Sequence, residues 1–172
     1  SRTLGFQFAP LLNAAGRLDD ADMAVHFLLS NDLQEAKKMV LKLDATNLER
    51  REKEGEMLET ALSLAETQKS DPALILVSPE FHEGINGIVA TRLVERFYKP
   101  VIILSEQEVS VLGEKKLKGS GRSIPELNLK DALSACSDLL LRFGGHAAAA
   151  GCSLLPEKFT EFRKRIFAFC HE

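Results

Sequence analysis

The spacing of apolar residues divides the chain into a helical first part and a mixed second part. The stretch Leu33–Lys69 contains no proline, and its apolar residues recur at helical spacing near both ends. Between them, Asp44–Glu56 is almost entirely polar, with Leu48 the main exception. A helix that is polar all round in its middle bridges two packed bodies, so the pattern predicts a long connecting helix. Two shorter helices with a break near Asn47 or Gly55 are the alternative that the same residues allow.

Short apolar runs after the break at 70–72 predict a β-sheet in the second part. Ala73–Val77 and Pro100–Leu104 have the composition of buried strands, and Ile85–Phe97 between them has helical spacing. A strand, a helix and a strand within about 35 residues form a βαβ unit, in which the two strands are parallel and the crossover is right-handed.

The remaining patterns complete an α/β fold: a mixed β-sheet flanked by helices and preceded by the long helix. Strands are expected at 109–112 and 116–124, turning near Gly113, and again at 151–155, with helices at 130–142 and after Pro156. Residues 1–18 are expected to be irregular, and Asp19 or Asp20 to cap a helix that ends near Leu29.

Composition and charge exclude several classes of protein. The net charge is −3, so no basic field covers the whole molecule, and any phosphate-binding site has to be local. The three cysteines are far apart and form no C-x-x-C motif, which argues against a zinc site or a disulfide framework and fits a reducing cytoplasm. The sequence shows no signal peptide and no membrane-length apolar run. Because the chain starts without methionine, we expect it to be cut from a longer protein.

The most informative motif is Gly144-Gly145-His146, which four alanines follow. Adjacent glycines let a backbone approach a ligand closely, and His146 can donate a hydrogen bond or carry charge near neutral pH. The small residues after it leave that approach open. The alternative is a tight turn before a packed alanine-rich element, with His146 as a capping or core residue.

Three further segments combine small residues with a polar or basic side chain. They are Asn13-Ala-Ala-Gly-Arg17, the segment from His82 to Arg92 that opens a predicted helix, and Lys116-Leu-Lys-Gly-Ser-Gly-Arg-Ser123. A helix N-terminus favours anions, and period two on a strand gives one face the side chains of Lys116, Lys118, Ser120 and Arg122. The alternatives are a packed loop with a paired arginine, a glycine-rich turn with an idle histidine, and an edge strand protected by lysines.

Together the four segments predict a wall that binds phosphate, without a hydrolytic centre of its own. Hydrolysis of phosphodiesters usually needs clustered carboxylates and histidines that hold divalent metals. No D-H-H or H-x-x-x-H cluster occurs in the sequence, and most acidic residues crowd onto the polar helix, where a solvated face explains them.

In their order along the chain, these motifs resemble the RecJ family of single-strand-specific 5′→3′ DNA exonucleases, within the DHH phosphoesterase superfamily. Each motif is weak alone, and the set is specific. The resemblance implies that residues 1–30 are the C-terminal remnant of a DHH catalytic domain, 31–70 the connecting helix, and 71–172 a DHHA1 domain that binds nucleic acid and phosphate. It implies a role in DNA repair and recombination, with release of 5′-mononucleotides.

The resemblance also implies roles for single residues. Arg122 and Ser120 would bind phosphate near the 5′ end of a strand, and His146 would act near the scissile phosphate. The full set expected to bind phosphate or substrate is Asn13, Arg17, His82, Arg92, Ser120, Arg122, Ser123, Gly144, Gly145 and His146. Mn²⁺ or Mg²⁺ would be held by the DHH motifs, which this chain lacks, so the chain alone is expected to be inactive and to hold no metal.

The implied partners are single-stranded DNA and, for the longer protein, a single-strand-binding protein and a helicase, with no membrane. Two other functions stay open. One is a DHH phosphodiesterase for short oligonucleotides, phosphoadenosine phosphate or cyclic dinucleotides, against which the long helix and the segment at 13–17 argue. The other is a non-enzymatic module that binds tRNA or a protein, as in alanyl-tRNA synthetases.

Overall fold

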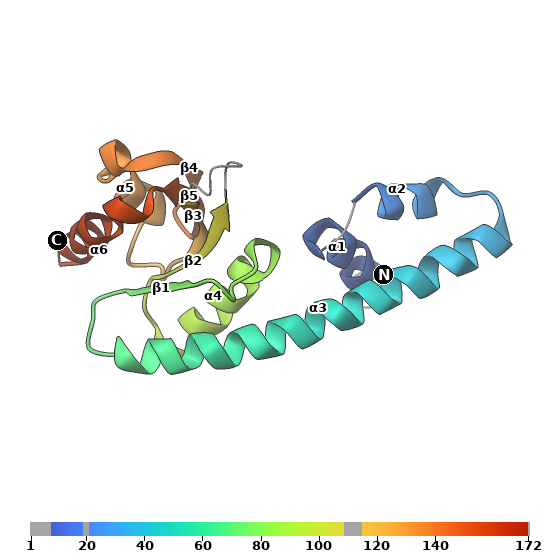
Figure 1. Cartoon of the computed structure of the whole chain (residues 1–172), viewed down its shortest axis with the longest axis horizontal. Helices are drawn as coiled ribbons and strands as arrows, with labels where there is room; N and C mark the ends of the chain where they lie inside the picture. The colour runs from blue at the N-terminus through green and yellow to red at the C-terminus, as the bar shows by residue number, and fades with distance from the viewer. Residues whose placement is uncertain (1–7, 19–20, 109–114, 172) are drawn as a thin grey trace. The chain divides into compact units, whose positions relative to one another are not determined.

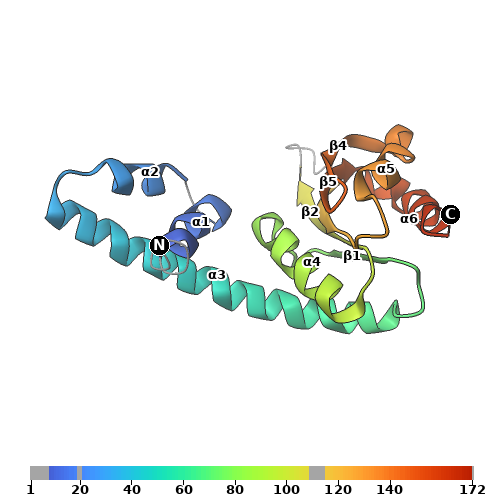
Figure 2. The ribbon, with the colours of Figure 1, turned by 180° about the vertical axis from the view of Figure 1, so that it is seen from behind.

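The computed structural model describes residues 8–18, 21–108 and 115–171, and it divides into two compact units, Ser1–Glu56 and Met57–Glu172. Each unit has its own apolar cluster. Figure 1 and Figure 2 show the elements of both units from opposite sides. Within the described residues, no helix is both long and apolar enough to cross a membrane.

The first unit consists of α1 (Ala9–Leu18), α2 (Ala21–Leu29) and the first part of α3 (Leu33–Thr67). Its centre is formed by Ala15, Ala24 and Leu43, against which Leu11, Leu12, Met23 and Phe27 pack. The prediction of an irregular segment is therefore wrong for residues 9–18. Proline usually breaks a helix, but Pro10 lies in the first turn of α1, where its missing N–H costs nothing. The predicted caps Asp19 and Asp20 lie outside the described residues.

Helix α3 is continuous, so the alternative with a break near Asn47 or Gly55 is wrong. The backbone N–H groups of Gln34 and Glu35 donate to Asp32 Oδ1 at 2.7 and 3.1 Å, which satisfies the helix start. The middle of the helix is not solvated all round, however. Thr46 and Asn47 are only 8% and 6% exposed, whereas Leu48 is 59% exposed. The polar sequence of residues 44–56 did not show which side of the helix is buried within the first unit.

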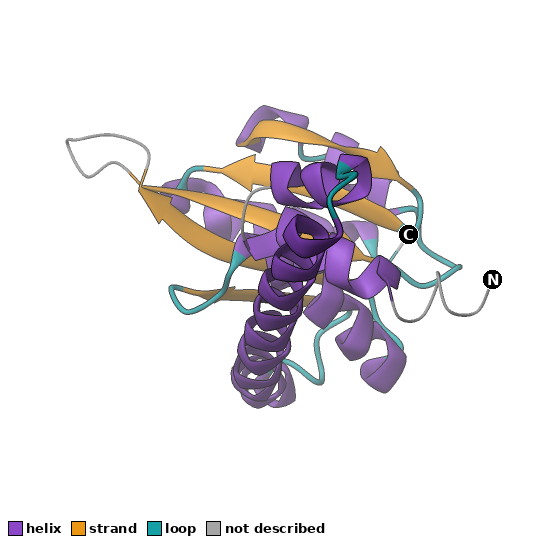
Figure 3. Ribbon diagram, turned by 90° about the vertical axis from the view of Figure 1, so that its right-hand side faces the viewer, coloured by secondary structure: helices purple, strands orange, loops and turns teal. Residues whose placement is uncertain are grey.

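The second unit contains one five-stranded sheet in the order β1-β2-β3-β5-β4, seen as a single continuous layer in Figure 3. The strands are β1 (Leu74–Ser78), β2 (Val101–Glu108), β3 (Lys115–Arg122), β4 (Leu140–His146) and β5 (Ala149–Leu154). Strands β1 and β2 are parallel and joined by α4 (Glu83–Phe97), which confirms the βαβ unit, and all other pairs are antiparallel. The expected mixed sheet flanked by helices, behind a long helix, is confirmed.

The two faces of the sheet are covered by different helices. On one face, Ile75, Ile102, Leu104, Leu117, Cys152 and Leu154 share an apolar cluster with residues of α5 (Leu129–Ser134) and α6 (Phe159–Phe169), including Leu133 and Phe162. On the other face, α4 packs on β2 and β3. Its buried residues Ile85, Val89 and Leu93 repeat at helical spacing. The sheet is thus the middle layer of this unit.

One predicted helix ends early and runs into a strand at its last three positions, 140–142. Residues 130–142 were expected to be helical, but α5 ends at Ser134, a short 3₁₀ turn follows at Ser137–Leu139, and Leu140 begins β4. A short apolar run fits a helix or a strand, and pairing with β5 decides for the strand. The strand predicted at 151–155 is confirmed as β5. After Pro156, a single 3₁₀ turn leads into α6, as expected. The strand predicted at 109–112 and its turn near Gly113 lie outside the described residues.

The continuity of α3 predicts the effect of replacing its internal glycine. A Cβ built on Gly55 meets no atom within 4 Å, so Gly55→Ala adds helix propensity without a clash. We expect the free energy of unfolding to rise by about 0.5–1 kcal/mol in thermal or denaturant unfolding followed by far-ultraviolet circular dichroism. A decrease would contradict a helical conformation at this position.

Candidate nucleic-acid interface

The sheet face toward α4 changes character between β2 and β3. On β1 and β2 its residues include Leu74, Leu76, Val101 and Ile103, all of them buried. From β3 onward the residues in register with them are basic, polar or small. Those on β5 and β4 are exposed or half-buried. This part of the sheet, which we call the open face, is where a ligand can reach the strands.

Strand β3 places its cations on the open face by strict alternation. Its burial pattern shows Leu117, Gly119 and Gly121 buried, while Lys118 is exposed and Arg122 half-buried. The predicted common face of Lys116, Lys118, Ser120 and Arg122 is therefore confirmed. Packing explains why Gly119 and Gly121 are glycines. A Cβ on Gly119 would lie 2.5 Å from the Ile103 carbonyl oxygen, and one on Gly121 would lie 2.7 Å from Leu129 Cδ2.

The register of β3, β5 and β4 arranges the open face in three rows. Directly paired residues of antiparallel strands point to the same side. The rows are Lys118–Ser153–Arg142, Ser120–Gly151–Gly144 and Arg122–Ala149–His146. The two outer rows each have a basic or imidazole side chain at both ends and a small residue in the centre. The middle row has only small residues, so the open face is a trough along β5 with charged walls.

A groove of about 440 Å³ occupies the trough. It is lined by Lys118, Gly119, Ser120, Arg142, Phe143, Gly144, Gly151, Cys152 and Ser153. The two glycines of its floor are not required by packing. A Cβ on Gly144 would meet nothing within 4 Å, and one on Gly151 would come no closer than 3.4 Å to another atom. Glycine within a strand lowers stability, so access for a ligand is the physical reason we find for both.

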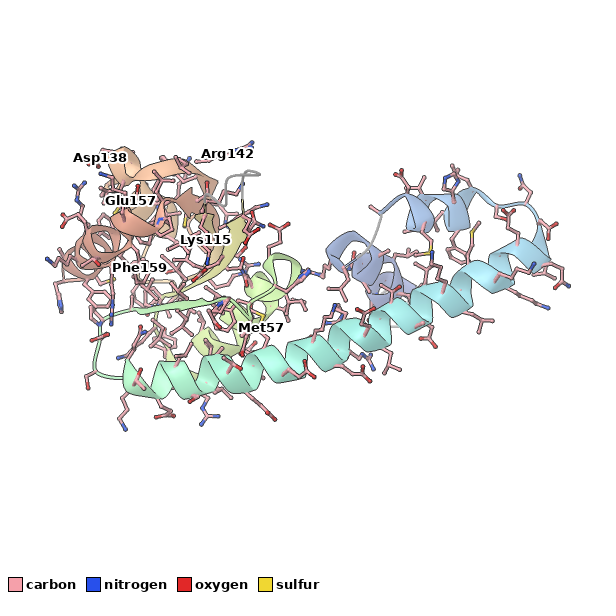
Figure 4. All side chains as sticks on the ribbon, in the orientation of Figure 1. Met57, Lys115, Asp138, Arg142, Glu157 and Phe159 are labelled. Carbon is pink, nitrogen blue, oxygen red and sulfur yellow. The ribbon has the colours of Figure 1, made fainter. Side chains whose placement is uncertain are left out.

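The groove walls carry positive charge, with one carboxylate that partly offsets it. Lys118 Nζ lies 2.7 Å from Glu83 Oε2 at the start of α4, and Gln107 Nε2 donates to the same oxygen at 2.6 Å. The hydrogen bond from Lys118 is the main reason why the pKa of Glu83 is lowered from its ordinary 4.5. Arg142 has no hydrogen-bond or ion-pair partner in the part of the chain that the structure describes. Figure 4 shows its side chain at the surface of the second unit.

Arg122 is positioned by α4. Its Nη1 donates to the Gly121 carbonyl at 2.8 Å, and its guanidinium lies beside Gly87, where a Cβ would come within 2.7 Å of Nη2. The glycine in α4 therefore makes room for the arginine. A planar guanidinium held this way presents N–H donors suited to phosphate oxygens.

The start of α4 is occupied by the chain's own groups. His82 is the N-cap, and its Nδ1 accepts a hydrogen bond from the Gly84 N–H at 3.2 Å. His82 thus satisfies a backbone N–H of the first turn, and the carboxylate of Glu83 offsets the partial positive charge of the helix terminus. This capping role is a structural reason for a histidine at position 82. Arg92 lies on the exposed side of α4, away from the buried positions 85, 89 and 93. Neither residue lines the groove.

Local contacts at the end of β4 explain the residue types at Gly145 and Ser123. Gly145 has φ +142°, and a Cβ there would overlap the Ala149 carbonyl oxygen and lie 2.5 Å from the Ala150 Cα. The Ser123 hydroxyl donates to the Leu127 carbonyl at 2.8 Å. The Ser123 backbone N–H donates to the Ala148 carbonyl at 3.0 Å, which ties this segment to the turn after the exposed His146. Gly145 and Ser123 are thus explained by local structure.

Asn13 and Arg17 lie in the first unit, four residues apart on one side of α1, and both are exposed. The expected loop at 13–17 is a helix, whose small residues Ala14 and Ala15 are buried. The alanines of this motif therefore serve packing within the first unit.

Sequence reasoning found Gly144 and His146 on β4 but missed the other residues of β4 and β5 that line the groove. Arg142, Gly151 and Ser153 were not proposed as site residues, and Lys118 was placed on the basic face without being chosen. The signal was present: Arg142, Gly144 and His146 alternate with period two. Because a helix was expected at 130–142, this alternation could not be used.

A mixed sheet with a cationic, glycine-floored open face defines an α/β domain suited to phosphate-containing ligands. The family model described as the DHHA1 domain matches residues 70–172, and the chain belongs to this family.

Relatives along the whole chain are more specific. The chain is 45% identical over 172 residues to the single-stranded-DNA-specific exonuclease RecJ of Dickeya dadantii, covering 95% of this chain and 29% of that protein. For RecJ of Bacillus subtilis the identity is 42% over 165 residues, with 95% and 20% covered. The crystal structure of RecJ from Thermus thermophilus in complex with Mg²⁺ matches with a TM-score of 0.87 at 36% identity, covering 98% of this chain and 26% of that chain. The resemblance seen in the motifs is confirmed, and the chain spans less than a third of these relatives.

The geometry of Gly145 predicts a large effect of its smallest substitution. Gly145→Ala forces a Cβ into the hairpin and a strained φ, which we expect to cost at least about 2 kcal/mol of stability and to lower Tm by about 4–8 °C. Gly144→Ala is the matched control, because its Cβ meets open space. Equal melting temperatures for the two variants would contradict the assigned backbone.

The pair of Glu83 and Lys118 predicts a pH-dependent stability. Because the pKa of Glu83 is lowered on folding, the pair stabilises the fold above pH 4.5 and loses its effect as pH falls through the folded pKa. Both side chains are half exposed, so Glu83→Gln should cost no more than about 0.5 kcal/mol at neutral pH. In denaturant unfolding, the difference between wild type and variant should shrink as the pH falls below 4.5. Glu95→Gln on the same helix is the control, and a difference that grows in acid would contradict the assignment.

Proposed function

We propose that this chain is the part of a RecJ-type single-stranded-DNA-specific 5′→3′ exonuclease that binds the DNA strand. One observation supports this most: a groove with cations on both walls and a floor of residues whose small size packing does not require. Its charge is local, in a chain whose net charge is −3. A site of this kind attracts phosphates and accepts a strand regardless of base sequence.

In the proposal, the polar residues of the open face each have a task; Lys118, Ser120 and Arg142 line the groove, and Arg122 and His146 lie on the open face beyond its lining. Arg122 and Lys118 on one wall, and Arg142 and His146 on the other, donate hydrogen bonds to phosphate oxygens. His146, at the end of β4, lies near the scissile phosphate and stabilises the charge that develops there. Ser120 contributes a hydroxyl on the floor. Asn13, Arg17 and Arg92 contact the strand outside the groove, where their exposure leaves them accessible.

The metal ions of the reaction belong to another part of the longer protein. Among the described residues, no group of three His, Cys, Asp or Glu side chains is close enough to hold an ion. Residues 8–18, 21–108 and 115–171 therefore provide no group of side chains that fits Mn²⁺ or Mg²⁺. When bound elsewhere, such ions activate water and neutralise phosphate charge. The chain alone would then be inactive.

The proposal divides the chain as the motifs suggest, with 1–30 as the end of a DHH domain, 31–70 as the connecting helix and 71–172 as the DHHA1 domain. The DHHA1 family match from residue 70 supports the last of these. The longer protein would act in DNA repair and recombination in the cytoplasm, releasing 5′-mononucleotides. A single-strand-binding protein and a helicase would supply and unwind its substrate.

Exonuclease assays on the longer protein test the proposal. With Mn²⁺ and a 5′-phosphorylated single strand, Arg122→Ala and His146→Ala should each lower kcat/KM by about 10–100-fold, the loss expected for a charged hydrogen bond. Arg51→Ala, which removes an exposed arginine from α3, is the control and should leave the rate near wild type.

The substrates that the longer protein hydrolyses provide the result that would contradict the proposal. A protein that hydrolyses dinucleotides or cyclic dinucleotides but leaves long single strands intact would replace the exonuclease by a small-substrate phosphodiesterase. Near-normal rates for both variants would remove Arg122 and His146 from the site.

A further inference from the structure

Lys118 and Arg142 face each other across the groove at the end away from His146. Both are in register with Ser153, which lies between them on β5. Two strand spacings separate the Cα atoms of the two cations by about 9.5 Å. Long basic side chains on both sides of a short serine can meet over it, so this row has the form of an anion site.

The row of Arg122 and His146 is a separate place. Lys118 and Arg122 are four residues apart on β3, which corresponds to about 13 Å along the strand. Between the two rows lies the row of Ser120, Gly151 and Gly144, which carries no charge. A single phosphate cannot contact both charged rows. A strand lying along β5 can place one phosphate at each row and rest a sugar or base on the uncharged floor.

Arg142 is the residue that would bind an anion at the row of Lys118, Ser153 and Arg142. Lys118 already shares its charge with Glu83 at 2.7 Å, so its net attraction for an anion is reduced. Arg142 is exposed and, within the described residues, has no carboxylate to neutralise it. Its guanidinium offers a planar pair of donors that matches phosphate.

Protection of an edge strand is the competing explanation for Arg142. Strand β4 is at the edge of the sheet, and charged residues there discourage pairing with another chain. That task needs only a charge at the edge and involves no ligand. It therefore predicts no dependence on the length of a bound nucleic acid, which separates the two explanations.

We propose that the open face has two phosphate subsites for one nucleic-acid strand, the first at the Arg122 row and the second in the groove, and that Arg142 is the residue that determines binding at the second. The inference rests on the proposed function and adds to it the direction of the strand's path, along β5 from the Arg122 row to the Arg142 row. It predicts that affinity rises with the length of the oligonucleotide and that this rise depends on Arg142.

The test measures binding of 5′-phosphorylated oligonucleotides of increasing length, starting from a mononucleotide, to the 172-residue chain by calorimetry and amide chemical shifts. Wild type should bind longer strands more tightly than the mononucleotide. Arg142→Gln should weaken the longer strands about tenfold, with a much smaller effect on the mononucleotide. It should also reduce the salt dependence by about one phosphate contact.

Two further variants complete the design. Arg51→Gln removes the same charge from an exposed position on α3 and should behave as wild type. Gly144→Val fills the floor where a Cβ meets open space, so it should fold normally and weaken binding of every strand long enough to cross it. Thermal unfolding of each variant checks that the fold is retained.

Each outcome decides one of the two claims. If Arg142→Gln keeps the length dependence of Arg51→Gln, or if wild type shows no length dependence, the second subsite is wrong, and the exonuclease assay on Arg122 still stands. If no oligonucleotide of any length shifts the amide signals of the groove in wild type, the second subsite is likewise overturned. Near-normal exonuclease rates for Arg122→Ala and His146→Ala would instead remove these two residues from the proposed site, and hydrolysis of dinucleotides but not of long single strands would overturn the proposed function.

Discussion

The open face depends on one constraint, the strict alternation of a strand that is paired on both edges. Because β3 pairs with β2 and with β5, its residues must alternate between the core and the open face. Gly119 and Gly121 fit the core side because the Ile103 carbonyl and Leu129 leave no room for a Cβ. A slip of one residue would bury Lys118 and Arg122, so the same close packing that holds β3 also fixes where its charges point.

Helix α4 completes the arrangement by covering only part of the sheet. Near the start of α4, its contacts with the sheet become polar: the buried Asn86 donates to Ser105 Oγ at 3.3 Å, and Ser105 donates to the Lys118 carbonyl at 3.0 Å. Here Glu83 holds Lys118, and Gly87 makes room for Arg122. Cations fixed by a strand and a helix are placed more precisely than cations on a loop, which suits a site that must hold a phosphate backbone.

Elements with a strong period were predictable from the sequence, namely the long helix, the βαβ unit and the basic face of β3. The sequence did not reveal features that depend on contacts between distant residues. Helix α1 was missed because Pro10 was given more weight than Ala14 and Ala15. Strand β4 was missed because only its pairing with β5, from Phe143 with Cys152 onward, distinguishes a strand from the end of a helix. Arg142, the cation on the β4 side of the groove, was missed with it.

The adjacent glycines of the Gly-Gly-His motif are there for opposite reasons. Gly145 is required by the fold, since its φ and the backbone of Ala149 and Ala150 exclude a side chain. Gly144 has space for one, and its glycine costs strand stability that folding alone would not accept. Gly151, which pairs with Gly144 from β5, likewise has room for a Cβ. Glycine at two paired floor positions, between cations on both sides, therefore supports the proposal that a ligand lies on the sheet. The proposed phosphate backbone would match both the charge of the walls and the flatness of the floor.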